Sequence, residues 1–193
     1  MPSKVEDKAL WAVLLPPVVV AFGVMVCVAC GLAAWQRAAP LSAPSLFPFS
    51  ETWYDKSVAA ATPAEGVADA QMAVKLAPAR AEDWMLLAYQ CSRADRGVSP
   101  RVISAVRQSY AVGPLTPEVS AYRLGFIFNA WPSLPQDIHE LARYEAQEYG
   151  TTGGGMLFLL RTAPTIRDPQ AHLEFAMVAM IARFQYSQLN QKP

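Results

Sequence analysis

Few residues of this chain have a type and spacing that could support acid–base catalysis. Glu145 and Glu148 stand three positions apart, which places both carboxyl groups on one side of a helix. Such a pair acts as general acid and base only when one carboxyl group is held away from water. The surrounding residues are mostly polar, so we expect a solvated helix surface. No serine lies in the Gly-x-Ser-x-Gly pattern of hydrolases either, and the sequence predicts no enzyme.

Metal and phosphate sites are not predicted. His139-Glu140 is not followed by a second histidine at the spacing of a zinc-protease helix. His139 and His172 are both expected on solvated surfaces. The three glycines at 153–155 lack the Lys-Ser or Lys-Thr that completes a phosphate-binding loop. We therefore expect no cofactor and interpret the glycines as a flexible connection between helices.

Composition narrows the class of partner. The 193 residues include 16 Lys plus Arg and 16 Asp plus Glu, giving a net charge of +0. Without a basic excess the chain has no electrostatic attraction to nucleic acid, so no nucleic-acid partner is expected. The hydrophobic fraction is 53% and only 17% of residues are charged, against about 25% in soluble domains. The chain thus contains more apolar residues than the core of one modest domain would bury, and part of them must be buried elsewhere.

An uncharged run of 27 residues, Ala9–Trp35, predicts a membrane-spanning helix, because a bilayer needs about 20 apolar residues. Trp11 and Trp35 lie near its ends, where aromatic rings favour the headgroup region. Pro16-Pro17 predicts a bend, with the straight part of the helix starting at position 17 or 18. A cleaved secretory signal and a lipoprotein signal are the alternatives. We expect an uncleaved anchor, because the apolar region of a signal spans about 7–15 residues.

Small residues recur every four positions in this run, at Gly23, Cys27 and Gly31. Such a stripe allows two helices to approach closely, so a homo-oligomer formed through these three residues is a further expectation. Cys27 and Cys30 also form a Cys-x-x-Cys pattern. Inside an apolar helix we interpret both as small hydrophobic residues and not as a redox pair.

Positive charges predict the orientation of the membrane helix. Lys4, Lys8 and the amino terminus precede it, whereas Arg37 alone follows it closely. The positive-inside rule then places residues 1–8 in the cytoplasm and the C-terminal domain on the exported side.

The residues after the membrane segment divide into a spacer and a helical domain. Three prolines within 36–49 predict an extended Pro-rich linker. From 50 to 193 apolar residues recur at helical spacing, and no stretch alternates like a strand, which predicts an all-α domain. Proline, glycine and threonine signals divide it into about eight helices: 50–61, 63–77, one starting near 82, 100–112, 117–130, 135–149, 156–162 and 168–188. The last carries a single apolar stripe, formed by Leu173, Ala176, Met177, Met180, Ile181 and Phe184.

Two of these helices share a pattern 37 positions apart. The first copy consists of Trp84, Leu87, Ala88 and Cys91, and the second of Ala121, Leu124, Gly125 and Phe128. Their types and spacing match the first helix of a tetratricopeptide repeat, whose period is about 34 residues. The pattern predicts a tetratricopeptide-like array of helical hairpins over 50–193. In such an array the small residues Ala88 and Gly125 are expected at contacts between paired helices.

Further segments extend this likeness. They are Ala81–Cys91, the run Arg107-Gln108-Ser109-Tyr110-Ala111-Val112-Gly113-Pro114, the triplet Tyr122-Arg123-Leu124, and the short helix, loop and long helix after Gly155. With the N-terminal membrane helix, the layout resembles small bacterial tetratricopeptide-like proteins associated with exopolysaccharide or O-antigen production. The resemblance covers about two thirds of the chain. It implies a single-pass inner-membrane protein with a periplasmic domain, and it supplies no catalytic residues.

Aromatic residues of the first helices are the candidate binding residues. Repeat arrays bind partners in the groove that these helices line, so Trp84, Tyr89, Tyr122 and Phe126 are expected to bind a partner protein. The alternative is that these aromatics pack between helix pairs or face the membrane. The leading functional hypothesis is a non-enzymatic scaffold in the cell envelope. A membrane-tethered enzyme or enzyme subunit acting on cell-wall or glycan material and an accessory subunit of a membrane complex are the alternatives.

Overall fold

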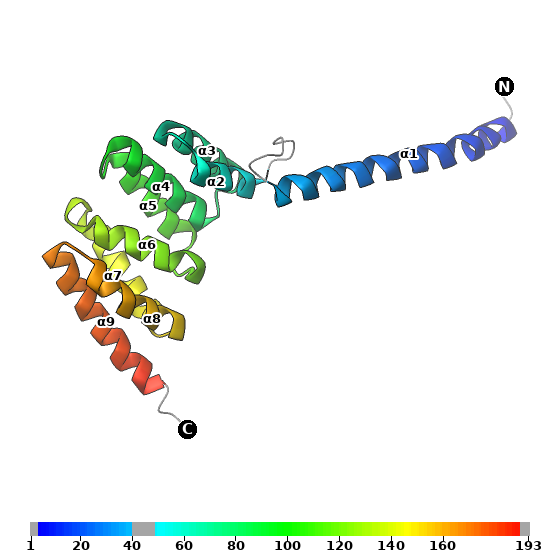
Figure 1. The fold of residues 1–193 in the computed structure, drawn as a ribbon. Coiled ribbons are helices and arrows are strands. Elements are labelled where there is room, and N and C mark those ends of the chain that lie inside the picture. The colour runs from blue at the N-terminus through cyan, green and yellow to red at the C-terminus, as the bar shows by residue number, and fades with distance from the viewer. Residues whose placement is uncertain (1–3, 40–48, 190–193) are drawn as a thin grey trace.

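The computed structural model describes residues 4–39 and 49–189, and the side chains of 19–39 and 49–189. Every regular element in these ranges is a helix, which confirms the predicted all-α class (Figure 1). In chain order they are α1 (Lys4–Ala38), α2 (Ser50–Ala59), α3 (Pro63–Leu76), α4 (Ala81–Asp95), α5 (Pro100–Val112), α6 (Pro117–Asn129), η1 (Trp131–Ser133), α7 (Gln136–Gly150), α8 (Gly153–Thr162), η2 (Ala163–Thr165) and α9 (Pro169–Leu189). Eight α-helices follow α1 in this part of the chain, as predicted. Most of the predicted linker, 40–48, lies outside the described residues, as do residues 1–3.

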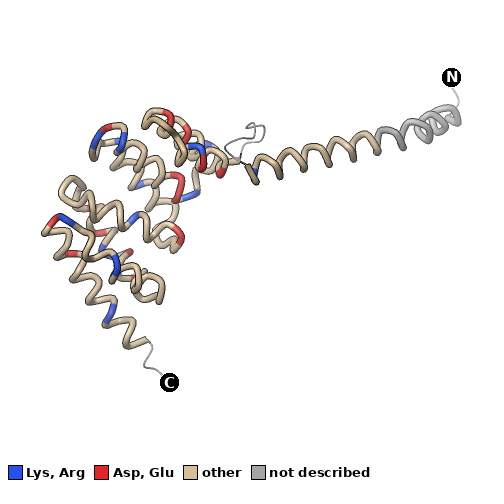
Figure 2. The backbone as a smooth tube through the Cα atoms, viewed as in Figure 1, with Lys and Arg blue, Asp and Glu red and all other residues tan. Residues whose placement is uncertain are grey.

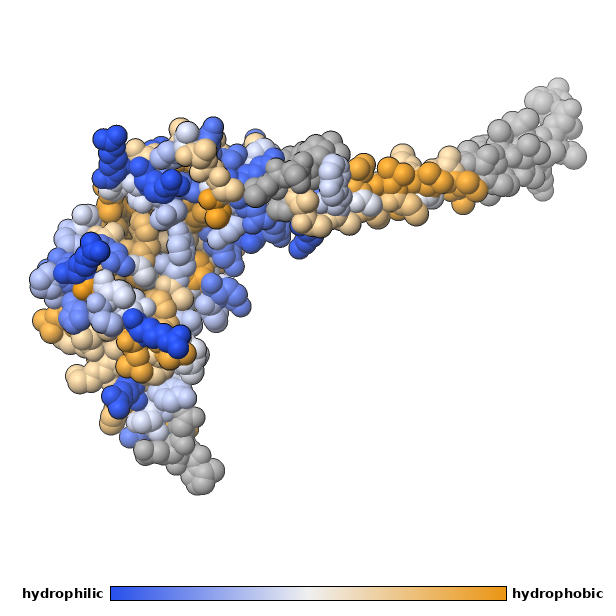
Figure 3. Space-filling model, in the orientation of Figure 1, coloured by the Kyte–Doolittle hydropathy of each residue, from blue (hydrophilic) through white to orange (hydrophobic). Residues whose placement is uncertain are grey.

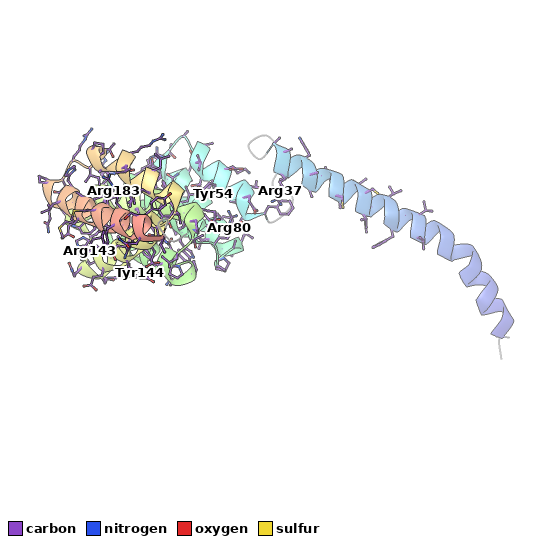
Figure 4. All side chains as sticks on the ribbon, turned by 90° about the horizontal axis from the view of Figure 1, so that it is seen from below. Arg37, Tyr54, Arg80, Arg143, Tyr144 and Arg183 are labelled. Carbon is purple, nitrogen blue, oxygen red and sulfur yellow. The ribbon has the colours of Figure 1, made fainter. Side chains whose placement is uncertain are left out.

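Helix α1 is continuous and projects from the other helices (Figure 1). Its Val19–Ala38 part has 20 residues and a mean hydropathy of 2.0, and is long and apolar enough to cross a membrane. In Figures 2 and 3 the part of α1 whose side chains are described, from Val19 onward, carries no charge before Arg37 and presents an apolar surface. The Pro16-Pro17 pair does not end the helix, but the N-terminal part curves away from the line of the rest, as predicted (Figure 4).

Local signals set several helix boundaries. The hydroxyl of Thr62 accepts a hydrogen bond from the backbone N–H of Glu65, and the Glu65 carboxylate accepts one from the backbone N–H of Thr62. This capping box starts α3, as the sequence predicts. Proline begins α3, α5 and α6, where its missing N–H would have no intrahelical partner. Helix α4 ends at Asp95, and the next residue, Arg96, adopts the left-handed conformation with φ 55°.

The three glycines form part of a helix and not a flexible connection, so that expectation is wrong. Helix α8 begins at Gly153, and the Thr152 hydroxyl accepts a hydrogen bond of 3.0 Å from the backbone N–H of Gly155. A Cβ atom on Gly155 would lie 1.9 Å from the carbonyl oxygen of Tyr149. Glycine is therefore required for the tight passage from α7 into α8.

Consecutive helices form hairpins that stack in a row (Figure 1). Helix α2 packs on α3 and α4 on α5, while α4 also contacts α2 and α6. The first helices of successive hairpins therefore lie side by side. Helices α7, α8 and α9 complete the row, with α7 in contact with α6, α8 and α9. One continuous core runs through the stack and includes Met85, Val106, Leu124, Phe128 and Phe175.

The two predicted small-residue contacts have different outcomes. Ala88 is completely buried in the core, as expected. Gly125 is only half-buried, and a Cβ atom built on it would meet nothing within 4 Å. The expectation of a packed Gly125 is therefore wrong. The contact of α6 with its neighbours is made instead by Leu124 and Phe128, which are both fully buried.

The apolar stripe of the last helix lies on its exposed face. Leu173, Met177, Met180 and Phe184 are between 48% and 68% exposed. The opposite face of α9 packs on α7 and α8 with the buried residues Ala171, Phe175, Val178, Ala179 and Ala182. Small residues predominate there because the helices approach closely: a Cβ atom on Gly150 of α7 would lie 2.5 Å from the Cβ atom of Ala182.

Candidate functional site

Three of the four predicted binding residues line one groove. Tyr89 from α4 and Tyr122 and Phe126 from α6 share it, although α4 and α6 are separated by the whole of α5 in the sequence. The contact between α4 and α6 brings the three side chains together. The groove has a volume of about 420 Å³ and is lined by Tyr89, Ala121, Tyr122, Gly125, Phe126, Asn129 and Ala130.

Small residues form the apolar part of the groove between the aromatic rings. Ala121, Gly125 and Ala130 leave space that larger side chains would fill. The open surroundings of Gly125 follow from this arrangement, because its Cα faces the groove and not a neighbouring helix. A groove of this size accommodates one or two side chains of a ligand.

The two tyrosines form an exposed aromatic pair across the helix contact. Their ring centroids are 6.1 Å apart and the ring planes are inclined by 66°, an edge-to-face arrangement. Tyr89 is 40% exposed and Tyr122 is 42% exposed. The guanidinium group of Arg93 lies 6.0 Å from the Tyr89 ring centroid, at the outer limit of a cation–π contact.

The groove is apolar and uncharged. No acidic or basic side chain is among its lining residues. Burial of part of the Tyr122 ring, together with the nearby hydroxyls of Tyr54 and Tyr89, raises the pKa of Tyr122 above its ordinary value. The Tyr122 hydroxyl therefore stays protonated and can donate a hydrogen bond at neutral pH. A ligand would meet aromatic faces, small apolar residues, hydroxyl groups and the Asn129 amide.

A buried ionic network positions α6, the helix that supplies most of the groove. Arg123 donates hydrogen bonds to the carbonyl oxygens of Ser109, Gly113 and Pro114, and so closes the end of α5. The same guanidinium forms an ion pair with Glu145 of α7, and both side chains are completely buried. One arginine thus connects three successive helices, and its neighbours Tyr122 and Leu124 are fixed on opposite sides of α6.

Glu145 is not on a solvated surface, so that expectation is wrong. Its carboxylate is fully buried and accepts hydrogen bonds from Arg123, from the Ser120 hydroxyl at 2.7 Å and from the Tyr110 hydroxyl at 2.8 Å. Burial and the adjacent carboxylate raise the pKa of Tyr110, so this hydroxyl remains a donor. Glu148, by contrast, is exposed. The two carboxyl groups therefore do not share an environment that would suit an acid–base pair.

Trp84 is the predicted binding residue that lies apart from the groove. It is half-buried against the core, and its indole N–H donates a hydrogen bond of 2.8 Å to the carbonyl oxygen of Pro78. The side chain therefore holds the start of α4 against the preceding turn and is not among the lining residues. Trp84 therefore lies outside the groove that Tyr89, Tyr122 and Phe126 line, and its role in partner binding stays a prediction.

Sequence reasoning did not select four of the lining residues, Ala121, Gly125, Asn129 and Ala130. The repeat spacing, which Ala121 and Gly125 share with Leu124 and Phe128, predicts a helix contact for Gly125 and gives no indication of a groove. The available signal was the sequence Ala121-Tyr122-x-x-Gly125-Phe126-x-x-Asn129, in which small, aromatic and polar residues follow one helical face.

The described residues contain no group of three or more His, Cys, Asp or Glu side chains that could hold a metal ion. His139 is half-buried, so the expectation of a solvated His139 is wrong. Its ring stacks on the Trp131 ring with centroids 3.8 Å apart, and its Nε2–H donates a hydrogen bond to the Trp131 carbonyl oxygen. His172 is exposed, as expected.

No protein-family model, curated protein or solved structure matches this chain.

Proposed function

We propose that this chain is a non-enzymatic, membrane-anchored scaffold whose groove between α4 and α6 binds a polypeptide segment of a partner protein. The observation that carries the proposal is the convergence of Tyr89, Tyr122 and Phe126 around the open surface of Ala121 and Gly125. Exposed aromatic side chains beside an unfilled apolar groove are costly in water unless a ligand covers them. Aromatic side chains also supply most of the energy of protein interfaces.

The chemistry of the groove favours an apolar side chain of the partner. Such a side chain would lie over Gly125, between the rings of Tyr122 and Phe126, where no charged group of this chain has to lose its water. The Asn129 amide and the tyrosine hydroxyls at the edge can bind main-chain groups of the same segment. This division into an apolar centre and a polar edge is the usual anatomy of a protein interface.

The apolar helix α1 favours a position at a membrane. We propose that it is a single-pass anchor in a bacterial inner membrane, that residues 50–193 lie in the periplasm and that the scaffold serves polysaccharide synthesis or export. The basic residues before the uncharged run Ala9–Trp35 outnumber those directly after it, and this difference supports these assignments together with the resemblance of the chain to small bacterial tetratricopeptide-like proteins. A reporter fused after Pro193 should be active only outside the cytoplasm. Activity of the reporter in the cytoplasm would contradict the orientation.

The enzymatic alternative has less support from the geometry. A hydrolase acting on glycan or cell-wall material would need a carboxylate at the site, and no carboxylate lines the groove. Glu145, the most buried acid of the helical domain near α6, is bound by Arg123 and two hydroxyl groups. The same groove also agrees with a role as accessory subunit of a membrane complex. That role differs from the proposed scaffold only in the partner, which would be another subunit of the complex.

Site-specific photo-crosslinking in intact cells tests the binding site. A benzophenone amino acid replaces Phe126 in the groove or, as control, Tyr144, which is 55% exposed on α7 and outside the groove. We expect a discrete crosslinked protein from position 126 and none from position 144. Gly125→Leu should abolish that product, because the leucine side chain would occupy the groove, and the Cβ atom at position 125 meets nothing within 4 Å. Equal products from both positions, or a product unaffected by Gly125→Leu, would refute the proposal.

A further inference from the structure

The exposed face of α9 has a different composition from the rest of the helical domain. Leu173 is 61%, Met177 48%, Met180 68%, Ile181 39% and Phe184 66% exposed. Ala176, Ser187 and Gln188 complete the face, which therefore carries no charged side chain over about four helical turns. The name α9 stripe is used below for the five large side chains Leu173, Met177, Met180, Ile181 and Phe184. At about 150–200 Å² for a free side chain of this size, the stripe exposes about 500 Å².

The α9 stripe is at an open end of the array. Helix α9 is the last of the stacked helices, and within the described chain nothing packs on its outer face (Figure 1). The terminal helices of stacked arrays are normally polar on the outside, because no further repeat covers them. An apolar outer face at this position indicates that another molecule covers it.

The lipid bilayer does not fit as that molecule. Figure 1 places α9 at the end of the array that is farthest from α1, the helix suited to span the membrane. Anchoring through α1 therefore keeps the α9 stripe away from the lipid surface. The occupant has to be a protein surface of matching shape and low charge.

We propose that the α9 stripe binds the α9 stripe of a second copy of this chain in an antiparallel pair with two-fold symmetry. Leu173, Met177, Met180 and Phe184 are spaced by four, three and four residues, which is the spacing of an apolar seam between two helices. This series reads the same in both directions. An antiparallel pair centred between positions 178 and 179 therefore sets Leu173 level with Phe184 of the second copy, and Met177 level with its Met180.

The size of the stripe suits a dimer. A stable interface buries about 800 Å² on each partner. The stripe supplies about 500 Å² of this, and the polar residues Gln185, Ser187 and Gln188 beside it, with the half-exposed Leu189, supply a rim. Two copies held in one membrane by α1 also meet at a raised effective concentration, so a modest interface is sufficient.

The flanking charges allow the same pair. Glu174 at one flank is engaged by Arg143 of its own chain at 2.9 Å. Arg183 lies at the other flank. In this register the Arg183 residues of the two copies are nine positions, or roughly 13 Å, apart along the helix axis. This separation exceeds a Debye length at physiological salt, so their mutual repulsion is screened.

Disulfide cross-linking in membranes tests the register with the full chain. Cys27 and Cys30 are replaced by alanine, and the buried Cys91 is kept. We expect the double variant Leu173→Cys/Phe184→Cys to form a covalent dimer on mild oxidation with diamide. The two new cysteines are 11 positions apart on one helix, roughly 16 Å, and cannot bond within one chain. Each single variant should form no covalent dimer, because in this register the same cysteine of the two copies is also roughly 16 Å apart along the helix axis.

A charged substitution gives an independent readout. Met180→Lys in the double-cysteine background should abolish the covalent dimer, whereas Gln71→Lys, on the exposed surface of α3, should leave it unchanged. Circular dichroism spectra verify that both variants remain helical, as expected for substitutions at exposed positions. Dimers from the single variants would mean a parallel pair or random collision, and absence of the dimer from the double variant would assign the stripe to another protein. Either result overturns the proposal.

Discussion

Arg123 and Glu145 form an ion pair in which neither side chain is accessible to solvent, and this pair joins α6 to α7. Their contact includes hydrogen bonds from the Arg123 Nε–H to both carboxylate oxygens, at 3.1 and 3.0 Å. Ser120 and Tyr110 complete the shell around the carboxylate. Because every strong hydrogen-bonding group of the pair has a partner, the two charges are stable inside the domain.

Removing one member of this pair should be more damaging than removing both. Glu145→Ala leaves the Arg123 guanidinium buried without its anion, and we expect it to lower the free energy of unfolding by about 3–5 kcal/mol. The double variant Arg123→Met/Glu145→Met should cost less than either single Met variant. Urea unfolding followed by circular dichroism measures all the values. Strict additivity of the single changes would contradict direct coupling between the two side chains.

The acidity of Asp83 gives a pH-dependent prediction. This carboxyl group is fully buried near the start of α4, and neither of its oxygens has a hydrogen-bond partner within the described residues. The Nε atom of Arg80 lies 4.0 Å away. Burial raises the pKa of Asp83 from 3.8 to about 6, against the opposing effect of Arg80. The folded state therefore keeps a proton in a pH range in which the unfolded state releases it.

The free energy of unfolding should consequently fall as pH rises from about 4 to about 6 and remain lower above that range. Two pKa units correspond to about 3 kcal/mol, which is the upper limit of the effect. Asp83→Asn should remove this fall and stabilise the domain at pH 7. The exposed Asp55→Asn on α2 is the matched control. Thermal unfolding between pH 4 and 8 measures both variants, and equal pH profiles for Asp83→Asn and the original chain would contradict the prediction.

The sequence predicts most of the fold because its signals are local. The Thr62–Glu65 capping box and the prolines that begin α3, α5 and α6 act within a few residues, and the structure contains them as expected. Helical periodicity likewise predicts the all-α class. Information about which face of a helix is covered comes from other helices, so periodicity alone does not supply it: the α9 stripe is apolar but exposed, and the opposite face of α9 packs on α7 and α8.

The site shows the same division between local and distant information. Tyr89, Tyr122 and Phe126 could be selected because the repeat spacing indicates which helices line a groove. The burial of Glu145 could not be predicted, because its partner Arg123 is 22 positions away. Trp84 is expected to bind because it is an aromatic residue of a first helix, whereas its hydrogen bond to Pro78 places it on another face of α4.

Gly125 and Ala88 should respond in opposite directions to enlargement. Ala88 is completely buried, so Ala88→Leu should overpack the core and cost about 1–3 kcal/mol of unfolding free energy. Gly125→Ala adds a methyl group that meets nothing within 4 Å and removes a flexible residue from a helix. It should raise the free energy of unfolding by about 0.5–1 kcal/mol. Destabilisation by Gly125→Ala would show that this residue packs against a neighbouring helix after all.

The groove itself is tested by truncating its two tyrosines. Tyr89→Ala and Tyr122→Ala should each weaken capture of the protein that crosslinks to position 126 by about tenfold, equivalent to about 1.4 kcal/mol, because each ring supplies rigid contact area at the centre of the groove. Tyr144→Ala is the matched control, since this tyrosine is 55% exposed on α7 and lies outside the groove. The protein is captured from detergent-solubilised membranes, and thermal unfolding verifies that each variant remains folded. Since the edge-to-face contact joins the two rings, their truncations should not be additive. Unchanged capture by the double variant would remove the groove from the interaction and leave α9 or α1 as the binding element.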